Sequence, residues 1–279
     1  MRETQPDIVF NVAECANGIS REAQIPAMLD MLDIPYTGSD PLTLTTCLDK
    51  SRAKEVLAYN GVPTSKFLYA EGIDDLDNFN LTFPVMMKPI AEGSSKGIFN
   101  SSYVTDLPTL KERLAEYLET YKQPFLIEEF LPGREFTVAL LGNGKDVEVL
   151  PIVEINFHEL PKDLVPIYSY EAKWVVDTRE KPLNIFTCPA NLDTILENKI
   201  KHVALRTYKV LRCRDWSRID IRLDKHGEPN VIEINPLPGI LPNPVDNSCY
   251  PKAARANGLS YEEMINKVLF TALKRYNLL

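Results

Sequence analysis

The sequence lacks long hydrophobic runs, paired cysteines and an excess of basic charge. A membrane-spanning helix needs about 18 successive apolar residues, whereas the longest apolar stretches of this 279-residue chain are short, such as residues 138–141. Lysine and arginine total 31 against 39 for aspartate and glutamate, so the net charge is −8. Nucleic-acid-binding proteins usually carry the opposite sign or a dense basic stripe. The sequence therefore predicts neither a membrane partner nor a nucleic-acid partner.

Cysteine is scarce and unpaired. Five cysteines are spread between residues 15 and 249 without a C-x-x-C spacing, although disulfide frameworks and zinc sites depend on such pairing. The first ten residues include Arg2, Glu3 and Asp7 and have no apolar signal core. We therefore expect reduced thiols and a cytoplasmic location.

Two common phosphate-binding motifs are absent, G-x-x-x-x-G-K-[ST] and G-x-G-x-x-G. What is present is the composition of an ordinary globular protein, with 44% hydrophobic and 25% charged residues. The length predicts about two domains.

Hydrophobic spacing and capping residues predict a mixed α and β protein with an antiparallel sheet in its second half. Helices are expected over residues 50–59, 107–121 and 191–211, and a C-terminal helix begins with the capping box Ser260-x-x-Glu263. Strands are expected over residues 84–88, 125–130, 135–141, 147–154, 216–223 and 231–235. The long irregular stretch over residues 156–188 is expected to be a functional lid or to be disordered.

The strongest candidate site lies on the hairpin that carries Arg218-x-Asp220 and Glu233-x-Asn235. The period of two in a strand places each pair on one face. Two carboxylates and an amide suit Mg²⁺, which takes a few oxygen ligands and keeps phosphate or water in its other positions. The backbone N–H of Gly239 and the guanidinium of Arg218 could together stabilise an oxyanion. The alternative is an ordinary solvent-facing side of a sheet, where acids are common.

A second candidate is Lys88 at the end of a buried strand, followed by the loop EGSSKG at residues 92–97. Small residues allow backbone N–H groups to approach a phosphate, and Ser94 adds a hydroxyl donor. A surface turn would have the same composition. Lys50, in a predicted helix, is a weaker candidate because most helix lysines are solvated.

Two further segments are candidates for holding a nucleotide. The strand edge that contains Glu128, Phe130, Leu131 and Glu135 combines acids with large apolar residues, which can grip a base and accept hydrogen bonds from a sugar. Alternating core residues of a sheet strand would look similar. In the long stretch, Lys173 could reach a phosphate and Trp174 could cover the site, although an idle loop lysine is the commoner case.

The order of these motifs resembles the ATP-grasp carboxylate–amine ligases, and among them the D-alanine:D-alanine ligases. The matching motifs are YTGS at 36–39, DK at 49–50, KP at 88–89, EGSS at 92–95, EFTV at 135–138, YEAK at 170–173, RID at 218–220, EIN at 233–235 and PG at 238–239. The resemblance implies an α+β, ATP-grasp fold, with two lobes enclosing ATP and a shortened N-terminal α/β lobe. It divides the chain into a remnant of that lobe (residues 1–47), a small central lobe (48–127) and a large C-terminal lobe with the metal site (128–279).

The resemblance also implies a reaction: the carboxylate of one amino acid is phosphorylated by ATP, and the amine of a second attacks the acyl phosphate to form a dipeptide. By resemblance, the nucleotide-binding residues are Lys50, Lys88, Glu128, Phe130, Leu131, Glu135 and Lys173. The ligands of Mg²⁺ or Mn²⁺ are Asp220, Glu233 and Asn235, and the catalytic residues are Ser94, Arg218 and Gly239. The implied partners are small amino acids, and because members of the family often form dimers, a homodimer.

The substrate side departs from the family pattern. The resemblance begins after the first strand–helix–strand segment, which carries a glutamate for the first amino acid, and the H-G-x-x-G-E-D-G loop is replaced by residues 14–22. Glu14 or Glu22 is a candidate to bind the substrate amine instead. A family tyrosine is replaced by Trp174, and the run 240–244 is expected to lack a hydroxyl that would contact the second substrate's carboxylate.

The leading hypothesis is therefore D-alanyl-D-alanine synthesis for peptidoglycan precursors. A ligase of the same fold for other amino acids or small peptides, and an ATP-binding protein without ligase activity, remain as alternatives.

Overall fold

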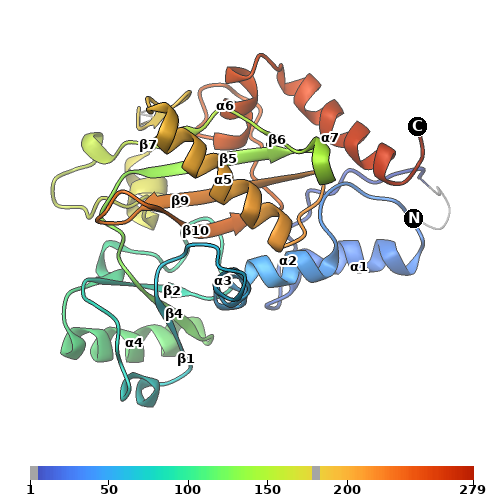
Figure 1. Cartoon of the computed structure of the whole chain (residues 1–279). Coiled ribbons are helices and arrows are strands. Elements are labelled where there is room, and N and C mark those ends of the chain that lie inside the picture. Colours follow the sequence, from blue (N-terminus) through green and yellow to red (C-terminus); the bar gives the residue numbers. More distant parts are fainter. Residues whose placement is uncertain (1–5, 178–182) are drawn as a thin grey trace.

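The computed structural model describes residues 6–177 and 183–279, which form an α+β structure around two antiparallel sheets (Figure 1). The small sheet has the strand order β1-β4-β2-β3. Its strands are β1 (Phe67–Ala70), β2 (Val85–Pro89), β3 (Tyr103–Val104) and β4 (Phe125–Glu129). The large sheet has the order β10-β9-β5-β7-β8, with β6 paired to β5. Its strands are β5 (Glu135–Leu141), β6 (Glu148–Val149), β7 (Val153–Ile155), β8 (Phe186–Thr187), β9 (Trp216–Leu223) and β10 (Pro229–Asn235).

Helices surround the two sheets, as Figure 1 shows. They are α1 (Gln24–Met31), α2 (Pro41–Leu48), α3 (Lys50–Tyr59), α4 (Leu107–Tyr121), α5 (Thr194–Val210), α6 (Cys249–Ala256) and α7 (Tyr261–Arg275). Among the described residues, no helix is long and apolar enough to cross a membrane.

Several predicted elements are confirmed with their bounds, namely α3, α4, β5 and β9. The helix predicted over 191–211 begins at Thr194, because the side chain of Asp193 caps it by accepting from the Leu196 amide. The strand predicted over 147–154 is wrong as one element. It is divided into β6 and β7 around Pro151, which has no N–H to donate to the ladder.

The predicted irregular stretch 156–188 contains more regular structure than expected. Its described part includes a 3₁₀ turn (Phe157–Glu159), a π-helical turn (Ala172–Val176) and β8. Residues 178–182 lie outside the described residues. The predicted division at residues 47 and 127 stays a prediction, although the strands of the small sheet all precede residue 130 and those of the large sheet follow it.

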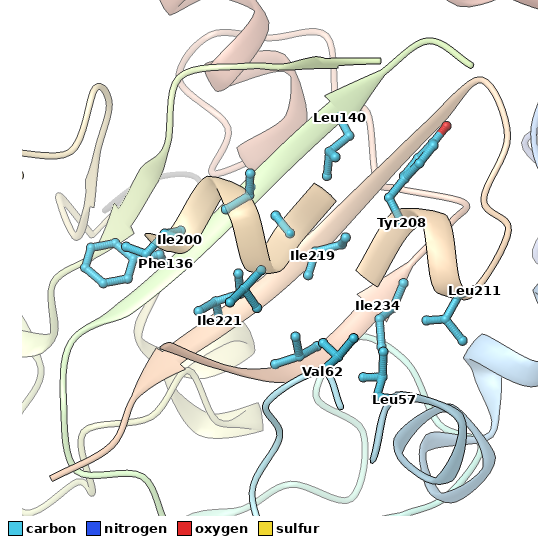
Figure 2. Close-up of a cluster of buried hydrophobic side chains, with 14 of the residues drawn as sticks. Leu57, Val62, Phe136, Leu140, Ile200, Tyr208, Leu211, Ile219, Ile221 and Ile234 are labelled. Atoms are coloured by element: carbon cyan, nitrogen blue, oxygen red, sulfur yellow. The ribbon is translucent and has the colours of Figure 1, made fainter. Parts of the chain in front are cut away.

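The main core lies between α5 and one face of the large sheet. Figure 2 shows Ile200, Tyr208 and Leu211 from the α5 segment over strand residues that include Ile219 and Ile221. Leu57 and Val62, from α3 and the segment after it, extend the same cluster beside Ile234 on β10. Because side chains alternate along a strand, burying Ile219 and Ile221 on this face turns Arg218, Asp220 and Arg222 to the other.

The other face of the large sheet is only partly covered. A second cluster packs Tyr250 of α6 and Met264 and Val268 of α7 on Ala139, Leu141 and Trp216. In the small sheet, α4 packs on Val85, Met87, Phe125 and Ile127, which leaves the alternate residues of β2 and β4 on the opposite face. The uncovered parts of both sheets are therefore available to line a cavity.

Candidate active site

A cavity of about 420 Å³ lies between these two uncovered sheet faces. All but one of the predicted site residues line it: Lys88, Ser94, Glu128, Phe130, Leu131, Glu135, Lys173, Arg218, Asp220, Glu233, Asn235 and Gly239. The exception is Lys50, the first residue of α3, which does not line the cavity but contacts Glu233, a residue that does. Its Nζ lies 2.9 Å from Oε1 of Glu233 and donates to the carbonyl of Glu92 at 2.6 Å.

Glu128 is held between two lysines at the small-sheet end of the cavity. Its carboxylate pairs with Lys54 Nζ at 2.7 Å and with Lys88, and it accepts a hydrogen bond from Ser65 at 2.7 Å. Burial alone would favour the neutral acid, but the two ammonium groups hold the pKa of Glu128 well below its usual range. Sequence reasoning missed Lys54. It lies four residues after Lys50, and therefore on the same side of α3.

Glu135 has a basic partner of its own. It lies opposite Arg222 in the β5–β9 register, and Arg222 Nη1 donates to Glu135 Oε2 at 2.8 Å. Burial raises the pKa of Glu135, against the effect of the guanidinium. The sequence showed that Arg222 shares a strand face with Arg218 and Asp220, but it did not indicate this pairing as part of the site.

The predicted metal ligands meet as the strand alternation required. Glu233 and Asp220 are direct partners in the β9–β10 register, with a bulge just before Glu233. Asn235 Nδ2 lies 3.3 Å from Asp220 Oδ2. Arg218 binds Asp220 through both Nε (3.0 Å) and Nη2 (2.8 Å).

The donor chemistry of this cluster suits a hard divalent cation, because it offers two carboxylates and one amide. In the parts of the chain that the structure describes, no three His, Cys, Asp or Glu side chains gather as a metal site. Asn235 is the third oxygen donor that the sequence predicts beside these two carboxylates. Burial opposes ionisation of Glu233, but the nearby Lys50 ammonium lowers its pKa, so this carboxyl group is an anion at neutral pH.

Two loops meet across the mouth of the cavity. Trp174 Nε1 donates to the carbonyl of Ser94 at 3.1 Å, and the Ser95 hydroxyl donates to the carbonyl of Tyr168 at 2.9 Å. Lys173 lines the cavity between them, and burial together with the charge of Arg218 lowers its pKa. Trp174 lines the cavity although the residue is 54% exposed, so it lies at the boundary between the cavity and solvent.

Acids from the N-terminal segment form the far end of the cavity. Glu14 and Glu22 both line it, and burial raises the pKa of Glu22 to about 7. Among the described residues no hydrogen bond or ion pair holds the side chain of Glu22. The arrangement leaves a half-buried carboxyl available to a cationic group.

Residues 240–244 carry no hydroxyl side chain, and the expected loss of a contact to the second substrate there stays a prediction. Ser248 lines the cavity, where its hydroxyl accepts from the Leu241 amide at 3.2 Å and donates to the Gly239 carbonyl at 3.1 Å. Ser248 therefore supplies a hydroxyl to the cavity from just beyond this run. A Cβ at Gly239 would meet no atom within 4 Å, so packing does not require glycine there.

Comparison with known proteins identifies relatives across nearly the whole chain. Residues 60–270 match the family model described as D-ala D-ala ligase C-terminus. The uncharacterized protein y4sG of Sinorhizobium fredii is 38% identical over 96% of this chain and 75% of its own length. The D-alanine–D-alanine ligase of Alcanivorax borkumensis is 34% identical over 90% of this chain and 73% of its own. The crystal structure of the Bacillus anthracis D-alanine–D-alanine ligase complexed with ATP superposes with a TM-score of 0.71 and 24% identity, over 98% of this chain and 81% of that one.

The two sheets and the cavity between them form an ATP-grasp fold, which the chain shares with this ligase structure. The chain belongs to the D-alanine–D-alanine ligase family, whose members are ATP-dependent ligases.

Proposed function

We propose that this protein is an ATP- and Mg²⁺-dependent ligase that joins two amino acids, with D-alanine in both positions as the first choice. One observation carries the proposal. Predicted site residues spread from Lys88 to Gly239 in the sequence converge on a single cavity between the two sheets, and Lys50 pairs with Glu233 at its wall. Phosphoryl transfer needs positioning and charge neutralisation rather than a covalent catalyst, and the cavity offers these.

In the proposed reaction, a carboxylate oxygen of the first amino acid attacks the γ-phosphorus of ATP, and ADP leaves. The amine of the second amino acid attacks the acyl carbon, loses a proton, and phosphate leaves as the peptide bond forms. Phe130 and Leu131 would contact the base, and Glu135 the sugar. Lys50, Lys88 and Lys173 would neutralise the phosphates, with Glu128 keeping Lys88 in place.

Asp220, Glu233 and Asn235 would hold Mg²⁺ or Mn²⁺, which supplies charge neutralisation at the phosphates when bound. Arg218 and the Gly239 N–H would stabilise the oxyanion of the acyl-transfer step. Ser94 would orient the substrates.

On the substrate side, Glu22 would bind the ammonium group of an amino acid, because it is a cavity carboxyl with no basic hydrogen-bonding partner among the described residues. Amino acids are the partners in this proposal, together with a second copy of the chain as a homodimer. A cytoplasmic location belongs to the same proposal, and the free cysteines of the described chain agree with it.

A ligase for a different pair of amino acids is the second candidate. It is favoured by the segment over residues 14–22, which departs from the family pattern and from which Glu14 and Glu22 line the cavity.

The proposal is tested by incubating the protein with Mg-ATP and a panel of D- and L-amino acids, following ADP release and identifying products by mass. We expect D-alanyl-D-alanine. Asp220→Asn and Glu233→Gln should each reduce turnover by roughly 10³-fold, whereas Glu228→Gln, at the exposed turn of the same hairpin, should leave turnover unchanged.

Other outcomes discriminate between the hypotheses. ADP release only with another amine replaces the substrate assignment and keeps the ligase. Tight ATP binding without turnover in any mixture favours the binding protein, and undiminished turnover in Asp220→Asn contradicts the metal assignment.

A further inference from the structure

Arg222 joins three separate segments at the nucleotide end of the cavity. The side chain extends from β9, and the residue is 4% exposed. Nη1 donates to Glu135 on β5 at 2.8 Å, and Nη2 donates to the carbonyl of Pro166, in the segment that leads to Lys173, at 2.9 Å. The guanidinium also lies over two aromatic rings, 4.8 Å from the centroid of Phe130 and 5.4 Å from that of Phe157.

The hydrogen bonds of Arg222 leave one of its own buried donors without a partner, an arrangement that stability alone would not favour. Its Nε–H is buried and has no hydrogen-bond partner in the described part of the chain, and leaving a buried donor unsatisfied costs free energy. The guanidinium is oriented so that Nη1 binds Glu135 and Nη2 binds the carbonyl of Pro166, and in this orientation Nε has no acceptor in the described part of the chain.

Arg134 provides a comparison within the same sheet. It pairs with Glu154 through both Nε (2.7 Å) and Nη2 (2.8 Å), donates to the Asn191 carbonyl at 2.9 Å, and lies over Phe136 at 5.1 Å. The same three kinds of contact, with a carboxylate, a carbonyl and an aromatic ring, are thus made with a bidentate fork and a satisfied Nε. Arg134 does not line the cavity, and Arg222 does.

The consequence for Glu135 is geometric. Arg222 takes Oε2, and no hydrogen bond from a described residue occupies Oε1. Phe130 contacts the same guanidinium and makes an edge contact with Tyr103, with 5.0 Å between the ring centroids. One side chain therefore sets the position of the proposed sugar acceptor relative to the proposed base contact.

We propose that Arg222 is a positioning residue for the nucleotide sugar: by orienting Glu135 against Phe130, it makes the site select a ribonucleotide over its deoxy analogues. The inference rests on the proposed function, because it takes ATP as the occupant of this end of the cavity. A hydroxyl-reading site discriminates strongly only when its acceptor is held in place, since a misplacement of about 1 Å can remove most of the effect.

The test compares the dissociation constants of ATP, 2′-deoxy-ATP and 3′-deoxy-ATP with Mg²⁺ and without amino acids, by titration calorimetry. The variants are Arg222→Lys, which keeps the charge but not the planar fork, and Arg222→Met. Arg134→Lys is the matched control. The affinity ratio between two nucleotides is independent of the fraction of folded protein, so partial misfolding of Arg222→Met does not obscure it.

We expect the intact protein to prefer ATP over at least one deoxy analogue, and the preference to fall about tenfold in both Arg222 variants but not in Arg134→Lys. Steady-state kinetics should show a higher KM for ATP with an unchanged KM for the amino acids. A preference that survives in both Arg222 variants overturns the positioning role while leaving the ligase proposal intact. Failure of the intact protein to bind any nucleotide overturns the proposed function itself.

Discussion

At the scale of single residues, the acids on the two sheets that face each other across the cavity are neutralised by basic neighbours. Glu128 has Lys54 and Lys88, Glu233 has Lys50, and Asp220 has Arg218. Such pairing lets an anionic ligand enter a cavity rich in carboxylates, because a triphosphate can take over the basic partners. Glu14 and Glu22, the cavity acids of the N-terminal segment, have no such basic partner among the described residues.

Substituting Glu22 should separate stability from function. Burial raises its pKa from 4.5 to about 7, so between these values the folded protein holds a proton that the unfolded chain has released, and stability falls as pH rises. Glu22→Gln should therefore increase the free energy of unfolding by about 1–3 kcal/mol at pH 8 and have little effect at pH 4.

Urea unfolding at both pH values measures this change, and the same variant should show a higher KM for an amino-acid substrate. Glu14→Gln is the control for stability, because Glu14 is exposed. Equal effects of Glu22→Gln at pH 4 and pH 8 would contradict a buried, protonated carboxyl.

At the scale of elements, α3 shows how a local cap positions a site residue. Asp49 ends α2 and begins α3, and its carboxylate accepts from the amides of Ser51 and Arg52. Lys50 is the first residue of the helix, and Lys54 follows one turn later. The cap therefore fixes the end of the helix from which both lysines reach Glu233 and Glu128.

Removing this cap should affect both stability and nucleotide binding. Asp49→Ala should cost about 1 kcal/mol of stability. It should also raise the KM for ATP several-fold, because the first turn of α3, which carries Lys50, is no longer held by the cap. Ser260→Ala, in the capping box of α7, should cost a similar amount without changing that KM. Chemical denaturation and steady-state kinetics on both variants measure the two effects, and equal KM values in both would show that the cap acts on stability alone.

The elements that the sequence did not indicate have identifiable causes. The eight residues of α2 include three threonines, whose branched side chains lower helix propensity. The equally short α6 contains Pro251 within its first turn. Both helices form because their apolar sides are buried, with Leu44 and Leu48 in α2 and Tyr250 and Ala254 in α6. The hydrophobic periodicity of α4 and β9, by contrast, was strong enough to predict these elements from the sequence alone.

At the scale of the whole molecule, the cavity depends on two sheets and on the loops that bridge them. The amide of Tyr170 donates to the Ile98 carbonyl at 2.8 Å, and the amide of Asn100 donates to Glu171. With the contacts of Trp174 and Ser95, these bonds connect the loop after β2 to the segment before β8. A ligand that contacts both sheets and these loops should therefore stabilise the molecule as a unit.

We expect a non-hydrolysable ATP analogue with Mg²⁺, at 100 times its Kd, to add about 2.7 kcal/mol to the free energy of unfolding. For a chain of this size the Tm should rise by roughly 5–10 °C. Thermal unfolding with Mg²⁺ or with EDTA separates the contribution of the ion, which should be lost in Asp220→Asn. An equal shift with EDTA would contradict a metal held by Asp220, Glu233 and Asn235.

The sequence by itself determined which side chains share a face. Alternation along residues 216–223 and 231–235 placed Arg218 with Asp220 and Glu233 with Asn235, and the register confirms both pairs. Only the tertiary structure decided which faces meet. The partners of the site acids, Lys54 for Glu128 and Arg222 for Glu135, come from other elements, as does the return of Ser248 to the cavity. Local patterns record the period of an element, whereas contacts between distant segments depend on how the two sheets pack, which no short window of sequence contains.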